Sequence, residues 1–235
     1  MKLLHLYHDI MNLYGDYANV LAVQRILENS GEEVTVERLS LGDDATLSDY
    51  DFIFIGSGTE RNQKVVLEDF KKYREQLAGY IASDKPLLMT GNSFEMLGNT
   101  ITDGDGTAFD GLKLYDFTVT EQRGKRSTAD VIASCDFLDK PLVGFINKSS
   151  MITGVRNPLC TVTFGIGNND AGQTEGIADR HFYGTHITGP VLQKNPHFLL
   201  YIAGLILGRK PADDCLLYEQ KGYDNTLKKL SERIK

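Results

Sequence analysis

Hydrophobic and polar residues alternate along the first half of the chain with two different periods. Short apolar or alternating runs predict four strands, at residues 2–7, 34–39, 51–55 and 87–89. Apolar residues at helical spacing predict a helix at 17–29, closed by Gly31, and another at about 62–81. Strands that alternate with helices over short connections predict a parallel sheet covered on both faces, with ligands bound beyond the carboxyl ends of its strands.

The second half of the chain has a different pattern. After a turn-rich break at 103–107, residues 112–164 consist mostly of short strand-like runs, which predict antiparallel strands that extend the sheet. An apolar helix at 196–207 and a charged amphipathic helix at about 211–234 follow. Because no linker rich in Pro, Gly or Ser and no internal repeat interrupts the chain, we expect a single domain over residues 1–235.

The segment from Pro86 to Gly98 predicts a strand, a tight turn and a helix with no room for a loop. This geometry presents the residue at the turn at the carboxyl edge of a parallel sheet, where many hydrolases place a nucleophile. The residue at the apex is Gly91, which tolerates a positive φ but has no side chain. The segment therefore has the shape of a nucleophile elbow without the nucleophile.

Composition narrows the functional classes. The chain has 235 residues, of which 41% are hydrophobic, and this argues for one sizeable core and against disorder. A formal net charge of −7 disfavours a general nucleic-acid-binding protein, which would carry a basic face. Three scattered cysteines (Cys135, Cys160 and Cys215) favour a reducing cytoplasm over a disulfide framework or a zinc site. We expect no secretory signal, and the longest apolar run, 198–207, is too short to span a membrane.

Three segments with glycines follow predicted strands. Gly56-Ser57-Gly58 either presents backbone N–H groups to an anion or forms a tight strand-to-helix turn, and a lone Gly-x-Gly favours the turn. For 11–16 we favour a capping turn, with Asp16 near the start of the next helix. Residues 164–170 contain two glycines and Asn-Asn-Asp, which suit either a hairpin or a recognition loop.

Two further segments carry candidate chemistry. His186 and Thr188 share one face if 184–190 is extended, although a single histidine is more often packed or hydrogen-bonded than a base. Arg126 lies in a run with Arg123 and Lys125, which is most simply a solvated loop, although one arginine can clamp a carboxylate with two hydrogen bonds.

Taken in order, six segments resemble class I glutamine amidotransferases of the cobyric-acid-synthase (CobB/CobQ) type, and among them the GatD-type glutaminase subunit of lipid II isoglutaminyl synthase. The matching segments are 12–16, 56–63, the elbow with Leu97-Gly98, Gly144-Phe145, 164–170 and Gly189-Pro190. The resemblance implies a flavodoxin-like three-layer α/β sandwich with a parallel central sheet extended by antiparallel strands, and neither a cofactor nor a metal ion. In that family the glutaminase subunit hydrolyses glutamine and passes ammonia to a Mur-ligase-like (MurT-type) partner, which amidates D-glutamate in lipid II, a peptidoglycan precursor.

The departures from the family pattern fall on its reactive positions. Aligned on Leu97-Gly98, Gly91 stands where the family has its catalytic cysteine, and Glu95 stands where it has a glutamine. Thr188 takes the place of the catalytic histidine before Gly-Pro, and the family's Glu-Asn-His appears as Ile146-Asn147-Lys148. Because amide hydrolysis by this fold needs both a thiolate and an imidazole, we expect a catalytically degenerate amidotransferase, a pseudoenzyme.

Three residues are considered as substitutes for the missing groups. Ser93 becomes a nucleophile only if the elbow shifts, although the spacing to Leu97-Gly98 is preserved. His186 can replace the base from the same strand face, about 6–7 Å along the strand. Cys160 lies in a strand-like run, and no feature of the sequence places it at an elbow.

The resemblance also implies a binding pocket. Backbone donors near Gly58 and Asn92 correspond to the family's oxyanion pocket, and Arg126 matches the arginine that holds the glutamine carboxylate. Glu95 adds a negative charge that repels a carboxylate and favours an ammonium group. One hypothesis is a non-catalytic subunit that binds a MurT-type partner, with glutamine or another small amino acid as candidate ligand. The alternatives are an active glutaminase or amidohydrolase that uses Ser93 and His186, and a small-molecule sensor built on Arg126.

Overall fold

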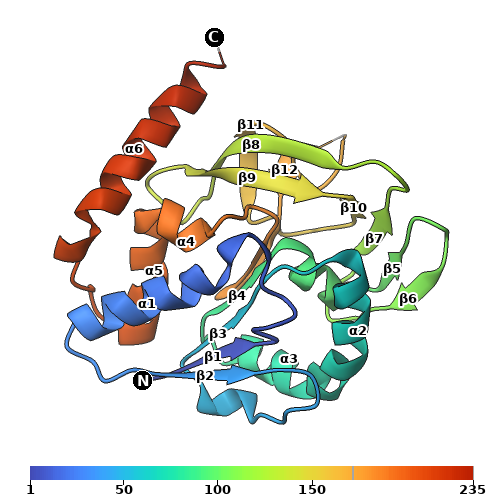
Figure 1. Cartoon of the computed structure of the whole chain (residues 1–235), viewed down its shortest axis with the longest axis horizontal. Helices are drawn as coiled ribbons and strands as arrows, with labels where there is room; N and C mark the ends of the chain where they lie inside the picture. Colours follow the sequence, from blue (N-terminus) through green and yellow to red (C-terminus); the bar gives the residue numbers. More distant parts are fainter. Residues whose placement is uncertain (171, 235) are drawn as a thin grey trace.

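A six-stranded sheet forms the centre of the computed structural model, which describes residues 1–170 and 172–234 (Figure 1). Its strands are β1 (Lys2–Leu6), β2 (Thr35–Leu39), β3 (Phe52–Ile55), β4 (Leu87–Thr90), β13 (Ile177–Asp179) and β14 (Phe182–Thr185). They are arranged in the order β13-β14-β4-β3-β1-β2, and every pairing is parallel except that of β13 with β14. The order β2-β1-β3-β4-β14 is that of flavodoxin-like sheets, so the predicted parallel sheet is confirmed.

Helices cover both faces of this sheet and complete three layers (Figure 1). One face carries α1 (Tyr17–Asn29), α4 (Val191–Lys194) and α5 (Pro196–Leu207), and the other carries α2 (Glu60–Phe70) and α3 (Arg74–Ala82). Neighbouring strand residues alternate between the two apolar clusters: Leu3 and Phe54 pack under α1 and α5, whereas Leu4 and Ile53 pack under α2 and α3. This alternation follows from the two-residue period of a strand.

Local hydrogen bonds explain where the helices begin. α1 has the predicted bounds, but Asp16 makes no side-chain bond at its start, so the predicted capping role of Asp16 is wrong. Asn12 Oδ1 instead accepts a hydrogen bond from the Tyr17 N–H at 2.8 Å. The Thr59 side chain caps α2 by accepting from the Asn62 N–H at 3.1 Å. The single helix predicted at 62–81 is divided into α2 and α3 by a 3-10 turn at Lys71–Tyr73.

Most strands of the second half lie in two further four-stranded sheets, with the orders β10-β7-β5-β6 and β12-β11-β8-β9. Their strands are β5 (Thr100–Thr102), β6 (Ala108–Asp110), β7 (Thr118–Glu121), β8 (Ser127–Ser134), β9 (Leu142–Lys148), β10 (Ser150–Thr153), β11 (Cys160–Phe164) and β12 (Thr174–Glu175). In the part of the chain that the structure describes, β13 is the antiparallel strand that extends the central sheet, so the prediction that the strands of 112–164 extend it is wrong. Half of the pairings in the two further sheets join sequence neighbours, such as β8 and β9, because short connections favour pairing between adjacent strands. The other half join strands farther apart in the sequence, such as β7 with β10 and β8 with β11.

Residues 164–170 belong to the connection between β11 and β12, which pair antiparallel as a hairpin. Asn168 holds this connection in place. Its N–H donates to Thr174 O at 2.7 Å, and its Oδ1 accepts from the Gly176 N–H at 2.9 Å. The hairpin interpretation of this segment is therefore confirmed.

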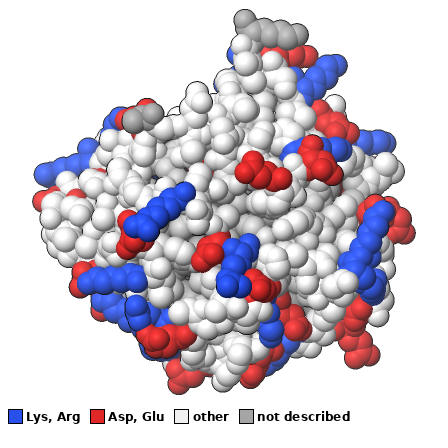
Figure 2. All heavy atoms as spheres, turned by 180° about the vertical axis from the view of Figure 1, so that it is seen from behind, with Lys and Arg blue, Asp and Glu red and all other residues white. Residues whose placement is uncertain are grey.

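The chain ends in α6 (Leu217–Ser231), which begins after a 3-10 turn at Asp214–Leu216 rather than at the predicted residue 211. Tyr223 and Leu230 of α6 pack on the sheet that contains β8 and β9. Among the residues that the structure describes, no helix combines the length and the apolar character needed to cross a membrane. Basic and acidic side chains are interspersed on the face shown in Figure 2.

Candidate functional site

Strand β4 ends in the predicted elbow at the carboxyl edge of the central sheet. Gly91 has a φ of +61° and begins a 3-10 helix, Gly91–Leu97. A Cβ atom at Gly91 would lie 2.2 Å from the Cβ of Ser57, whereas carbon atoms in good contact are about 3.5–4 Å apart. Glycine is therefore required at the apex both by the backbone conformation and by the approach of Ser57.

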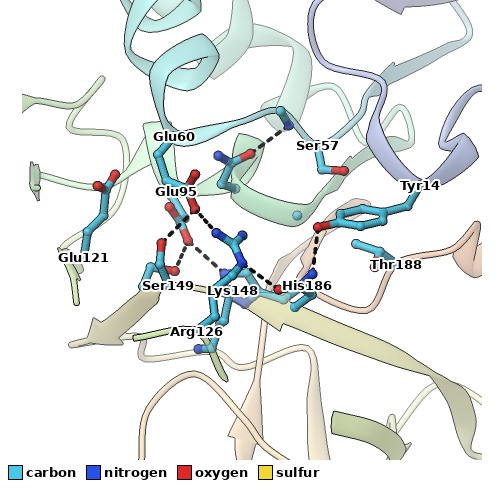
Figure 3. A pocket seen from close by; sticks show the side chains of 15 residues that line it. Tyr14, Ser57, Glu60, Glu95, Glu121, Arg126, Lys148, Ser149, His186 and Thr188 are labelled. Carbon is cyan, nitrogen blue, oxygen red and sulfur yellow. Dashed lines mark hydrogen bonds and ion pairs between the residues drawn. The ribbon is translucent and has the colours of Figure 1, made fainter. Parts of the chain in front are cut away.

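A small pocket lies beside this elbow, and it brings together most of the predicted site residues (Figure 3). These are Gly58, Gly91, Asn92, Glu95, Arg126, His186 and Thr188. The cavity volume is only about 20 Å³, which is room for about one water molecule. Pockets that bind small molecules are typically about 300–1,000 Å³. Side chains of the protein itself fill most of the site.

The backbone donor of Gly58 is already paired. Its N–H donates to Asn92 Oδ1 at 3.0 Å. The predicted donor of an oxyanion pocket therefore meets a side chain of the same chain.

Arg126 reaches the pocket but binds protein groups there. Its Nη1 donates to Glu60 Oε1 and its Nε donates to Asn147 Oδ1, both at 2.7 Å. Asn147 Nδ2 in turn donates to the Tyr14 hydroxyl at 3.0 Å (Figure 3). Burial acts to raise the pKa of Glu60, but hydrogen bonds from its backbone, Ser149 and Arg126 hold it below its usual value. Glu60 and Asn147 thus fix the position of the guanidinium group.

Glu95 and His186 belong to a chain of buried hydrogen bonds. His186 Nε2 lies 2.9 Å from Glu95 Oε1, and His186 Nδ1 lies 3.2 Å from Glu175 Oε1. Glu95 also accepts hydrogen bonds from Ser150 Oγ and, at 2.8 Å, from Gln63 Nε2. Each ring nitrogen of His186 therefore faces a carboxyl oxygen. His186 is committed to this chain rather than free to act as a base.

The pKa values of Glu175 and Lys148 are shifted in and beside this hydrogen-bonded network. Burial would raise the pKa of Glu175, but hydrogen bonds and charge from His186 and a hydrogen bond from Thr185 hold it below its usual value. Thr185 Oγ1 donates to Glu175 Oε2 at 2.7 Å. Burial lowers the pKa of Lys148, against the opposing charges of Glu95 and Glu175. The Lys148 ammonium donates to Asn168 O at 2.7 Å.

The other candidate residues are buried or are hydrogen-bonded to the main chain. The Ser93 hydroxyl is buried, and its single proton lies within hydrogen-bond reach of two main-chain oxygens, Thr90 O at 2.8 Å and Ile55 O at 3.1 Å from Oγ. Ser93 does not line the pocket. The Thr188 hydroxyl lines the pocket but donates to Phe145 O at 3.1 Å. Cys160 is buried in β11, away from the elbow.

Sequence reasoning missed the environment of Asp16. Its Oδ2 accepts hydrogen bonds from the Ser57 N–H at 2.7 Å, the Ser57 hydroxyl at 2.6 Å and the Thr90 hydroxyl at 3.0 Å. Burial raises the pKa of Asp16 against the effect of these bonds. The three residues lie after three different strands or at their ends, so no local spacing in the sequence signals their contact. Asp16 holds Ser57 in the position that excludes a side chain at Gly91.

Sequence reasoning also missed the acidic side chains that surround Arg126 and His186. Glu60 and Glu121 line the pocket, and Glu175 lies behind it. Within residues 1–170 and 172–234, no group of three or more His, Cys, Asp or Glu side chains is arranged to hold a metal ion.

Comparison with known proteins gives a family match. The family model of the CobB/CobQ-like glutamine amidotransferase domain matches residues 2–196. The chain is 30% identical over 225 residues to subunit GatD of lipid II isoglutaminyl synthase (glutamine-hydrolyzing) from Staphylococcus aureus strain N315, covering 96% of this chain and 90% of the relative. The same subunit of Streptococcus pneumoniae strain R6 is 28% identical over 219 residues, which cover 92% of this chain and 84% of the relative.

Solved structures share the fold at low sequence identity. PurLQS from Thermotoga maritima aligns with a TM-score of 0.56 at 12% identity and covers 96% of this chain and 98% of its own. A glutamine amidotransferase from Thermotoga maritima aligns with a TM-score of 0.54 at 12% identity and covers 100% of this chain and 97% of its own. The predicted three-layer amidotransferase fold is confirmed.

Proposed function

Because the chain belongs to the family of CobB/CobQ-like glutamine amidotransferase domains, we propose that it is a GatD-type subunit without glutaminase activity. In this proposal it binds a Mur-ligase-like (MurT-type) partner and takes part in lipid II amidation in the cytoplasm. Both curated relatives are GatD subunits of lipid II isoglutaminyl synthase, and their similarity over most of the chain supports the subunit role.

The apex of the elbow carries the proposal. A cysteine-dependent glutaminase forms a thioester between its thiolate and the amide carbon of glutamine. Gly91 offers no atom for that bond, and Ser57 occupies the space that a Cβ would need. Backbone donors alone stabilise an oxyanion but cannot form the covalent intermediate.

The position of the base supports the same conclusion. Thr188 carries a hydroxyl that binds Phe145 O, where the family resemblance expects an imidazole. The imidazole of the pocket, His186, lies between Glu95 and Glu175. Loss of two cooperating catalytic groups removes little more activity than loss of one, so their joint absence fits relaxed selection on hydrolysis.

The alternative of a relocated serine is less well supported. The Ser93 hydroxyl is directed to two main-chain oxygens in the protein interior. To attack a substrate in the pocket it would have to leave both of them, and the elbow would have to shift.

Ammonia release from L-glutamine tests this proposal. The purified chain, alone and mixed with a MurT-type subunit, is expected to release no ammonia above background, with GatD of Staphylococcus aureus as the positive control. Ser93→Ala is the matched variant and is expected to change nothing. Robust release that Ser93→Ala abolishes would overturn the proposal in favour of a relocated serine. Robust release that survives Ser93→Ala would overturn it in favour of another nucleophile.

A further inference from the structure

Asn92 places its side chain on the donor that an external ligand would use. This residue follows Gly91 directly. Its Oδ1 accepts a hydrogen bond from the Gly58 N–H at 3.0 Å, although the two residues are 34 positions apart in the sequence. The backbone of Asn92 is itself held, because its carbonyl oxygen accepts a hydrogen bond from Gln63 Nε2 at 2.6 Å. The contact between Asn92 and Gly58 therefore joins two anchored segments.

The group that Asn92 presents has the chemistry of a glutamine side chain. Both end in a primary carboxamide, whose carbonyl oxygen accepts hydrogen bonds. Gly58 is the residue whose N–H we expect to donate a hydrogen bond to an oxygen of the substrate. In this structure a carboxamide of the protein takes that bond.

The volumes of the pocket and of the hollow beside it are consistent with Asn92 acting as a ligand of the pocket. With Asn92 in place the cavity is about 20 Å³. A wider hollow of about 510 Å³ adjoins it and shares four lining residues with it: Glu60, Glu121, Arg126 and Ser149. The hollow has room for the backbone end of an amino acid, so the part of the site that lacks space is the part that Asn92 fills.

The charges of the pocket select for a neutral group at this point. Three carboxylates line the pocket, those of Glu60, Glu95 and Glu121. The arginine and the lysine of the lining already have partners, since Arg126 Nη1 donates to Glu60 Oε1 and Lys148 Nζ donates to Asn168 O. Their effect is visible at Glu121, whose pKa is raised by burial and by the charges of Glu95 and Glu60, against the effect of Lys64. A side-chain carboxylate entering the same space would be repelled, whereas a carboxamide would not.

We infer that Asn92 is an internal ligand of the amide pocket: its carboxamide binds the Gly58 N–H and thereby excludes the side chain of L-glutamine. This inference rests on the proposed function, since it concerns the same glutaminase-like site. Removing the carboxamide frees one N–H donor and the adjoining space. The pocket then accepts a neutral carboxamide in preference to a carboxylate.

The test compares the wild type with Asn92→Ala, which removes the carboxamide, and with Asn92→Asp, which keeps its shape and an acceptor oxygen. L-Glutamine and L-glutamate are titrated into each protein, and the Gly58 amide signal is followed in ¹H–¹⁵N spectra. L-Glutamine is expected to shift this signal saturably in Asn92→Ala, with binding about two- to tenfold tighter than in the wild type, the value of one hydrogen bond. L-Glutamate is expected to bind the variant more weakly, and Asn92→Asp to resemble the wild type.

Two results would overturn the inference: an equal response of the wild-type Gly58 signal to L-glutamine, or a folded Asn92→Ala that does not respond. Should Asn92→Ala fail to fold, Asn92→Ser is titrated instead, because its shorter side chain also vacates the donor. Ammonia is measured in the same samples to separate this inference from the proposed function. Binding with ammonia release overturns the non-hydrolytic role and leaves the internal ligand standing, whereas a folded, non-binding variant overturns only the internal ligand.

Discussion

At the scale of single residues, the surroundings of Gly91 restrict what can stand at the apex of the elbow. Its φ of +61° and the 2.2 Å separation between a virtual Cβ and Ser57 Cβ act together. Ser57 in turn is held by two hydrogen bonds to Asp16. A cysteine at the apex would therefore require a change in the β3–α2 loop as well as in the elbow.

Restoring both family residues is expected not to restore a full family-level rate of hydrolysis. In Gly91→Cys/Thr188→His the new side chain meets Ser57, so the thiol lies away from a productive position, and catalysis requires placement within about 0.5 Å. We expect ammonia release well below that of an intact family member and a free energy of unfolding lower by about 1–3 kcal/mol, the usual cost of a strained backbone position. Activity is measured by ammonia release and stability by urea unfolding.

A second variant locates the cause of that strain. Adding Ser57→Gly removes the Cβ that Gly91→Cys meets, and is expected to recover part of the lost stability. A double variant that turned over glutamine at the rate of an intact family member would contradict this account, since the defect would then be confined to two residues.

Asp16 is expected to make folding sensitive to pH in the acidic range. Burial raises the pKa of Asp16 in the folded state above its usual value of 3.8. The folded state then binds more protons than the unfolded state, so the free energy of unfolding falls as pH rises through this interval, and the deficit persists at neutral pH. In Asp16→Asn this decline should disappear, because the amide does not ionise.

Urea unfolding of the wild type and Asp16→Asn at several pH values between about 4 and 7 checks this expectation. As pH rises, the free energy of unfolding of the wild type should fall relative to that of Asp16→Asn. Asp9 provides the matched control: it is exposed and its pKa is lowered chiefly by Ser40. Because the effect of a lowered pKa is lost only below about pH 4, Asp9→Asn should leave the difference from the wild type nearly constant over this range. A pH-independent difference for Asp16→Asn would contradict the role of burial.

At the scale of elements, Glu175 joins two sheets. It lies in β12, and it accepts hydrogen bonds from Thr185 at the end of β14 and from the N–H of His186. β12 belongs to the sheet of β8 and β9, whereas β14 belongs to the central sheet. One buried carboxylate thus fixes the second-half strands to the core of the fold.

Replacing Glu175 by glutamine is expected to lower the free energy of unfolding by about 3–5 kcal/mol, because it removes one charge of a buried pair. The folded-state pKa of Glu175 lies below its usual value of 4.5, so its stabilising effect is present above pH 4.5 and is lost as the pH falls through the folded-state value. In urea unfolding, the free energy of unfolding of the wild type should fall at acidic pH, and that of Glu175→Gln should fall less. If Glu175→Gln lost as much unfolding free energy at acidic pH as the wild type, Glu175 would not be the group responsible.

At the scale of the whole molecule, the family match covers residues 2–196. In the proposed function, the departures that matter for hydrolysis fall at Gly91, Glu95 and Thr188. A binding role needs the folded surface but not the nucleophile. This pattern is expected of a subunit whose remaining task is association.

We therefore expect this chain to form a stable complex with a MurT-type subunit when the two are co-expressed. Size-exclusion chromatography at micromolar concentration should show a single peak that contains both proteins. Gly91→Cys/Thr188→His is a useful control, because changes inside the pocket should not affect a surface contact. Separate elution of the two wild-type proteins would reject the partner role and make a small-molecule sensor built on Arg126 the leading alternative.

The sequence by itself determined the layered fold and its main elements. Hydrophobic periodicity placed α1 and α5 at their observed bounds, because amphipathic spacing and terminal residues are local properties. The positive φ of Gly91 also followed from local pattern, since a strand that turns directly into a helix needs such a residue.

Only the tertiary structure decided how the pocket is filled. Asn92 and Gly58, Asp16 and Thr90, and Glu95 and His186 are separated by 34, 74 and 91 positions. Side-chain hydrogen bonds over such separations leave no periodic signal, because they depend on how the strand ends converge. The same reason explains the separate sheets of the second half, where strand pairing is set by three-dimensional proximity and connection length. Local sequence specified which residues stand at the site, and long-range packing specified that they bind one another.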